Sequence, residues 1–224
     1  MYRSPIAERI MADHLLDHGA VSFFAETPMR LKSGLITPIY VNNRILSSYP
    51  DAWRDVMETI ISTIDRLHLE FDMIAGMEGA GLSHAAALAY RLGKPYVYIR
   101  REAKSWGEKN RIEGCCVKGK RVLIIEDHLS TGLSLLSAID AVREEGGLVE
   151  DALAITSFGI EETMKLLAER KVEAHEVVDF RNVLKVAVEK KMITEAQHAA
   201  LEDWLKHPWS WAARHGLVAN ATEN

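Results

Sequence analysis

The stretch that decides the fold is Arg121-Val122-Leu123-Ile124-Ile125-Glu126-Asp127-His128-Leu129-Ser130-Thr131-Gly132-Leu133-Ser134. It opens with an apolar run, which predicts a buried strand over 121–126 that ends in two adjacent carboxylates. Small and hydroxylated residues follow, and apolar residues then recur at helical spacing over 133–145. A strand that leads through a polar turn into a helix is the unit from which parallel α/β sheets are built.

The sequence on both sides of this stretch repeats the alternation. Amphipathic spacing predicts helices over about 6–16 and 51–67, the first of them stopped by Gly19. Further strands are expected at 72–76, 96–100, 151–157 and 175–178, and further helices at 81–92, 161–170, 180–190 and 194–206. Short apolar strands separated by helices indicate an α/β fold, with a mostly parallel central sheet flanked by helices.

The chain of 224 residues is long enough for one substantial core, with smaller parts attached. Residues 1–50 are expected to form an N-terminal helix and a small hood of short extended pieces that stands apart from the core. Residues 51–206 should form the α/β core with its C-terminal helices. In the tail, 207–224, Trp209 and Trp211 are expected to dock before the chain frays.

Composition excludes several classes of protein. The 27 basic and 32 acidic residues give a formal net charge of −5, which argues against nucleic-acid binding as the main activity. Apolar runs fall short of a membrane span and the first residues are amphipathic, so a cytoplasmic protein is expected. Cys115 and Cys116 are adjacent, and a bridge between neighbours would be strained, so reduced thiols are expected.

The turn at 130–134 predicts a binding site for a phosphorylated sugar. Free backbone N–H groups and hydroxyls would converge in front of the next helix, which suits a phosphate monoester. Glu126 and Asp127, one step earlier, suit sugar hydroxyls. The Gly-Lys-Ser/Thr of nucleotide-binding P-loops and the spaced glycines of dinucleotide-binding turns are both missing here. The alternative is a capped helix beside two solvated acids.

A second polar segment, 100–111, is strongly basic. It contains five cations and two anions on a loop between two predicted strands: Arg100, Arg101, Lys104, Lys109 and Arg111 against Glu102 and Glu108. Such a loop can close over an anionic substrate and stabilise charge on a leaving group. Charge alone does not separate this reading from an ordinary solvated loop.

Three sequence motifs in this chain resemble motifs of a known enzyme family. The segment 126–134 reads acid-acid-x-x-Ser-Thr-Gly-x-Ser, and it resembles the donor-binding motif of type I phosphoribosyltransferases. The loop Arg100-x-x-Ala103-Lys104-x-x-Gly107, followed by Ile112-Glu113-Gly114, is similar to the catalytic loop of orotate phosphoribosyltransferases. The segment 31–44 is similar to the hood of the same enzymes, so the likeness covers nearly all of the chain before Pro208.

The resemblance implies roles for particular residues. The donor-binding set is Lys32, Arg100, Arg101, Lys104, Glu126, Asp127, His128, Leu129, Ser130, Thr131, Gly132, Leu133 and Ser134. Within it, 130–134 would hold the 5-phosphate, and Glu126 and Asp127 the ribose hydroxyls. Lys104, Arg100 and Asp127 are the expected catalytic residues, with Lys104 stabilising the leaving group. Tyr40, Val41 and Ser130 would line the orotate pocket.

The resemblance also implies a reaction and its partners. The phosphoribosyl group of 5-phosphoribosyl 1-diphosphate (PRPP) would pass to orotate, with Mg²⁺ held mainly by the diphosphate and water rather than by a protein metal site. A homodimer is implied, in which the loop 100–113 acts in trans. Two alternatives stay open: transfer to another nucleobase, and a donor-binding regulatory paralogue.

Two departures from the family pattern bear on these expectations. Trp106 stands where the family usually has histidine, and an indole cannot shuttle protons. His128 replaces the usual apolar residue, and its position beside two acids predicts a side chain that ionises near neutral pH.

Overall fold

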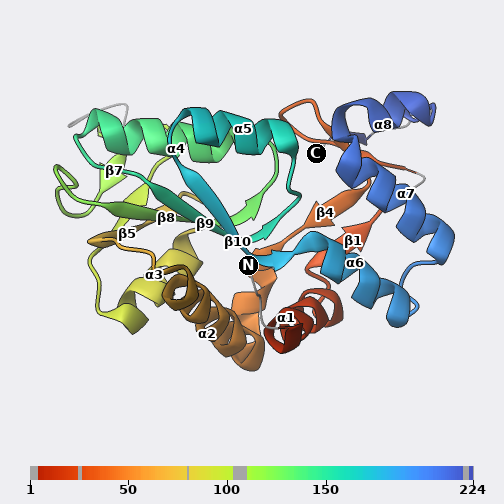
Figure 1. Cartoon of the computed structure of the whole chain (residues 1–224), viewed down its shortest axis with the longest axis horizontal. Coiled ribbons are helices and arrows are strands. Elements are labelled where there is room, and N and C mark those ends of the chain that lie inside the picture. The colour runs from red at the N-terminus through yellow and green to blue at the C-terminus, as the bar shows by residue number, and fades with distance from the viewer. Residues whose placement is uncertain (1–4, 25–26, 80, 103–109, 219–221, 224) are drawn as a thin grey trace.

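The computed structural model describes residues 5–24, 27–79, 81–102, 110–218 and 222–223, and it contains a six-stranded sheet in the order β10-β9-β8-β5-β6-β7 (Figure 1). The first five strands in this order run parallel, and β7 pairs antiparallel with β6 at one edge. The predicted fold class, a mostly parallel sheet flanked by helices, is therefore confirmed. The strands of this sheet are β5 (Met73–Met77), β6 (Tyr96–Ile99), β7 (Ile112–Glu113), β8 (Val122–Leu129), β9 (Asp151–Ser157) and β10 (Glu173–Asp179).

Helices cover both faces of this sheet (Figure 1). Alternate residues of β8 enter two separate cores: Leu123 and Ile125 pack with the N-terminal helices, and Val122 and Ile124 pack on the other face. One face is covered by α4 (Leu133–Glu144) and α5 (Glu161–Glu169). The other is covered by α1 (Pro5–Asp17), α2 (Pro50–Leu67), α3 (Gly81–Leu92) and α6 (Phe180–Glu189). In the described part of the chain, no helix is both long and apolar enough to cross a membrane.

Strand β8 runs three residues further than the sequence predicts. Its pairing with β9 continues through His128 opposite Thr156 and Leu129 opposite Ser157. Main-chain hydrogen bonds to a neighbouring strand outweigh the low strand preference of the polar residues. Glu126 and Asp127 therefore lie inside the strand rather than at its end.

The hood consists of two short antiparallel pairs. Strand β1 (Val21–Phe23) pairs with β4 (Ile39–Val41), and β2 (Met29–Arg30) pairs with β3 (Ile36–Thr37). Leu35 and Ile39 are 1% exposed and belong to the same apolar cluster as the residues of α1 and α2. The hood is thus part of the main core, which differs from the expectation of a separate appendage.

The C-terminal segment folds onto the hood. Trp204, on α7 (Glu195–Lys206), donates its indole N–H to the carbonyl oxygen of Ile36 at 2.9 Å. Trp211 docks as expected and is 1% exposed, whereas Trp209 is 51% exposed. The chain then forms α8 (Pro208–Arg214), and β11 (Thr222–Glu223) pairs in parallel with β2.

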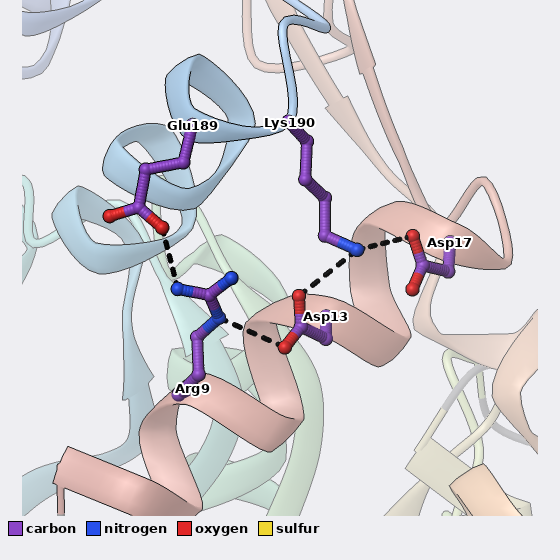
Figure 2. Close-up of polar contacts among 5 residues, drawn as sticks. All are labelled: Arg9, Asp13, Asp17, Glu189 and Lys190. Carbon is purple, nitrogen blue, oxygen red and sulfur yellow. Dashed lines mark hydrogen bonds and ion pairs between the residues drawn. The ribbon is translucent and has the colours of Figure 1, made fainter.

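Figure 2 shows an ion-pair network that joins α1 to the C-terminal end of α6. Arg9 donates to Asp13 on its own helix and to Glu189, with Nη1 2.5 Å from Oε2. The Nζ atom of Lys190 lies 3.0 Å from Oδ1 of Asp13 and 2.6 Å from Oδ1 of Asp17. The side chains are partly exposed to solvent, so each ion pair contributes little to stability.

Candidate active site

The turn from β8 to α4 depends on Gly132. Its φ is +74°, and a Cβ there would lie 2.7 Å from Cγ2 of Thr163, so a side chain at this position would be both strained and obstructed. Thr163 also donates its hydroxyl to the carbonyl oxygen of Ser130 at 3.0 Å. The turn is therefore anchored from α5, which fixes the start of α4.

A cavity of about 190 Å³ lies at this turn. The first N–H groups of a helix have no acceptor within the helix, so α4 presents donors toward the turn. The buried hydroxyl oxygen of Ser130 has no hydrogen-bond partner among the described residues. Ten predicted donor-binding residues line the cavity together: Arg101, Glu126, Asp127, His128, Leu129, Ser130, Thr131, Gly132, Leu133 and Ser134. Backbone and hydroxyl donors at a helix N-terminus form an arrangement suited to an anion.

The two acids of β8 differ in environment. Glu126 is 8% exposed, and Asp127 is half-buried. Oε1 of Glu126 accepts from the main-chain N–H of Asp127 at 3.2 Å, while Oε2 has no partner within the part of the chain described. Burial, and then the charge of Asp127, raises the pKa of Glu126 well above its ordinary value. A ligand with hydroxyl groups would complete the hydrogen bonds of this pair.

Arg101 brings positive charge to the same cavity. Its main-chain N–H donates to Oε2 of Glu78 at 2.9 Å, and its Nε donates to the carbonyl oxygen of Glu78 at 3.2 Å. The cavity wall is completed by Met77, Glu78, Arg101 and Leu135. Arg100 lies in an adjoining hollow with Glu78 and Gly79, where its Nη1 is 3.9 Å from Oε1 of Glu113. The two arginines therefore flank the same loop after β5.

Besides Arg100, three of the predicted residues that the structure describes lie outside the cavity wall. Lys32 is exposed in the turn between β2 and β3, and Tyr40 and Val41 are half-buried on β4. The structure places them on the hood and does not bring them into contact with the cavity. Lys104 and Trp106 lie outside the described residues, so the predicted role of Lys104 stays a prediction.

A buried polar network under the cavity was not anticipated from the sequence. Asn43, on the 3₁₀-helix η1 (Asn43–Ser48), donates its amide to the carbonyl oxygen of Asp127 at 2.5 Å and to the hydroxyl of Thr156 at 2.8 Å. The same hydroxyl lies 2.9 Å from Nδ1 of His128. Burial lowers the pKa of His128 to about 4, so the prediction that it ionises near neutral pH is wrong.

Three potential metal ligands come together elsewhere. Among the residues described, Asp151, Glu173 and His175 form the cluster in which such atoms lie within 4.8 Å of one another. His175 Nε2 is 2.7 Å from Oδ1 of Asp151. These residues lie toward the amino ends of β9 and β10, whereas the cavity lies at the carboxyl end of β8, so the cluster is not part of the candidate site.

The fold and the site can be compared with known families. Residues 45–183 match the family model of the phosphoribosyl transferase domain. An orotate phosphoribosyltransferase of Rhizobium rhizogenes is 39% identical over 220 residues, which are 97% of this chain and 94% of the relative. The chain therefore belongs to the orotate phosphoribosyltransferase family, as the motifs at 31–44, 100–114 and 126–134 predicted.

Solved structures agree with this assignment. A structure of Leishmania donovani UMP synthase superposes with a TM-score of 0.78 and 31% identity. It matches 91% of this chain, which spans only 42% of that larger protein. Orotate phosphoribosyltransferase from Aeropyrum pernix superposes with a TM-score of 0.68 and 28% identity, over 81% of this chain and 98% of the other.

Proposed function

We propose that this protein is a pentosyltransferase that moves the phosphoribosyl group of PRPP to orotate, giving orotidine 5'-phosphate and diphosphate in pyrimidine biosynthesis. The observation that carries the proposal is the cavity at the end of β8, where an anion cradle and two carboxylates line one space. The names of the relatives support orotate as the acceptor.

The cradle at 130–134 would bind the 5-phosphate of the donor, because the helix N-terminus and the Ser130 hydroxyl supply donors without an added charge. Glu126 and Asp127 would accept hydrogen bonds from the two ribose hydroxyls. These contacts fix the sugar and leave its anomeric carbon facing the hood. Tyr40 and Val41 would then line the acceptor side.

In the reaction, a ring nitrogen of the acceptor forms a bond to the anomeric carbon while the bond to diphosphate breaks. This displacement needs no covalent nucleophile from the protein. It needs two reactants held in near-attack geometry, and cations beside the departing diphosphate. Arg101 lines the cavity, Arg100 lies in the adjoining hollow, and we propose that Lys104 completes the set.

The site fits magnesium as a partner of the donor. Mg²⁺ prefers oxygen ligands and retains much of its water, and Oε2 of Glu126 is a buried oxygen without a partner among the described residues. Glu126 and Asp127 would accept hydrogen bonds from the water around the ion, while the diphosphate binds it directly. When bound, the ion neutralises charge on the leaving group.

The assay that tests the proposal follows the absorbance of orotate on mixing protein, Mg²⁺, PRPP and orotate. Loss of absorbance with release of diphosphate is expected. Adenine, guanine, hypoxanthine, xanthine and uracil in parallel would reveal transfer to another base. PRPP binding without transfer to any base, together with RNA binding at physiological salt, would instead indicate a regulatory protein. A protein that does not bind PRPP with Mg²⁺ would overturn the proposal.

We also propose that the protein acts in the cytoplasm as a homodimer in which the loop 100–113 reaches the partner subunit's site. Mixing the variants Lys104→Ala and Asp127→Asn tests this arrangement. In a hybrid dimer one site would contain neither substitution, so random mixing should restore about a quarter of wild-type activity. A mixture as inactive as its parts would exclude action in trans.

A further inference from the structure

The network of Asn43, Thr156 and His128 joins three elements around the candidate site. Asn43 and Thr156 are both 0% exposed. The amide of Asn43 donates to the hydroxyl oxygen of Thr156 at 2.8 Å, and that oxygen lies 2.9 Å from Nδ1 of His128. The contacts link η1 below the hood to strands β8 and β9.

The direction of the contact between Thr156 and His128 sets the tautomer of the ring, and Nδ1 is the acceptor where the hydroxyl donates. Because the Thr156 oxygen already accepts from Asn43, its own hydrogen is available for Nδ1. A neutral imidazole that accepts at Nδ1 carries its proton on Nε2. The ring is neutral at physiological pH, since burial lowers the pKa of His128 to about 4.

The other ring nitrogen is the unexplained part of the network. Nε2 of His128 is buried and has no hydrogen-bond partner among the described residues. The ring is held on one side by the edge-on contact with Phe158, with centroids 4.2 Å apart. A buried donor without an acceptor is unfavourable, so this nitrogen calls for a partner such as a bound ligand or water.

The position of the network indicates which part of the ligand is involved. His128 lines the cavity directly after the two acids proposed to hold the ribose. Asn43 lies two positions after the hood residue Val41 and three after Tyr40. An acceptor bound between sugar and hood would lie beside the His128 ring.

We propose that His128 determines acceptor specificity by donating its Nε2–H to an oxygen of the base, a ring carbonyl or carboxylate oxygen of a pyrimidine carboxylate. The inference rests on the proposed function and adds to it a residue that recognises the acceptor rather than the donor. It also changes the role expected for His128, which the resemblance placed among donor-binding residues.

Kinetics of His128→Val and His128→Gln test this role. Valine suits a strand but removes the hydrogen bond, so KM for orotate should rise about tenfold while the Kd for PRPP stays within about twofold. Glutamine retains an N–H donor and should recover part of the loss. Thr156→Val, which removes the hydroxyl beside Nδ1, should also raise KM for orotate. Unchanged KM for orotate in the His128→Val enzyme would overturn the inference.

A measurement on the unaltered protein avoids any folding defect of the variants. The ¹⁵N resonances of the His128 ring should show Nε2 protonated and Nδ1 unprotonated. The Nε2–H signal should shift with orotidine 5'-phosphate, which carries the base, and not with ribose 5-phosphate, which lacks it. A proton on Nδ1, or equal shifts with both ligands, would contradict the inference.

The two proposals fail in different ways. Absence of orotate consumption by the wild-type protein would overturn the proposed function and this inference with it. Normal consumption, combined with indifference of orotate KM to His128→Val, would overturn the inference alone.

Discussion

The side-chain amide of Asn43 donates to the main-chain carbonyl oxygen of Asp127, with 2.5 Å between the two atoms. Asn43 follows the hood, and Asp127 belongs to the strand that carries both acids. This bond fixes the backbone of Asp127 relative to the hood. The contact therefore connects the strand proposed to hold the sugar to the segment that follows the hood.

Asp127→Asn should weaken PRPP binding about 10- to 100-fold, because a neutral amide replaces a charged acceptor of hydroxyl hydrogen bonds. The fold should be spared, since the side chain is half-buried and its carbonyl bond to Asn43 remains. Calorimetric titration with PRPP and Mg²⁺ measures the effect. Asp140→Asn, on the solvated side of α4, is the control and should bind like wild type. Wild-type affinity of Asp127→Asn would remove Asp127 from the sugar site.

Lys104→Ala should lower turnover about 10²-fold or more, the size of effect that follows loss of one group stabilising developing charge. Binding of PRPP should change less than about tenfold, because the cradle and the acids remain. Single-turnover kinetics, with binding measured separately, distinguish the two steps. Lys165→Ala on the exposed face of α5 is a matched charge control. Unchanged turnover would exclude Lys104 from the chemistry.

The protonation state of Glu126 should affect how the stability of the protein depends on pH. Burial and the charge of Asp127 raise the pKa of its carboxyl above the ordinary 4.5. The folded protein therefore keeps a proton that the unfolded chain releases. The resulting stabilisation is complete below the unfolded pKa and is lost as pH rises through the folded pKa. Glu126→Gln cannot ionise, so it should gain stability over wild type as pH rises above the ordinary pKa of a glutamate side chain.

A control with the opposite sign is available on α5. The ion pair with Lys165 lowers the pKa of Glu161, so its contribution is present above the unfolded pKa and is lost in acid. Glu161→Gln should lose stability relative to wild type over the same rise in pH. Urea unfolding at several pH values measures both differences. Parallel curves for wild type and Glu126→Gln would contradict the assignment.

Trp204→Phe should lower the free energy of unfolding by about 1–3 kcal/mol, because the buried carbonyl oxygen of Ile36 loses its donor. Trp209→Phe changes the same residue type on α8 at a half-exposed position. It should remain within about 0.5 kcal/mol of wild type. Chemical denaturation gives both free energies of unfolding. Equal losses in the two variants would show that the hydrogen bond from the Trp204 indole does not contribute measurably to stability.

Much of the fold could be predicted from local patterns. The apolar runs and helical spacing between residues 72 and 157 predicted β5, β6, β8, β9, α3 and α4 in their right order, but not the two-residue edge strand β7. The end of β8 at Leu129 could not be read locally, because it depends on pairing with β9. Helix α8 was missed because seven residues give little periodicity, although Pro208 at its first turn is a start signal.

The residues of the candidate site also fall into a part that the sequence predicted and a part that it could not predict. Residues 126–134 are contiguous, so their spelling predicted a set that the structure brings to one cavity. Asn43 and Thr156 are 113 positions apart, so no local sequence motif could predict that their side chains form a hydrogen bond. The neutral state of His128 also follows from burial, which a sequence does not display.

The shared core of hood and helices has a consequence for how the molecule comes apart. Leu35 and Ile39 are buried with residues of α1 and α2, and the indole of Trp204 donates a hydrogen bond to Ile36. The hood therefore cannot detach without breaking the main core. Partial digestion should therefore not liberate a stable piece lacking residues 21–48. The hood, proposed to line the acceptor side of the site, should therefore unfold only together with the rest of the molecule, in a single cooperative step.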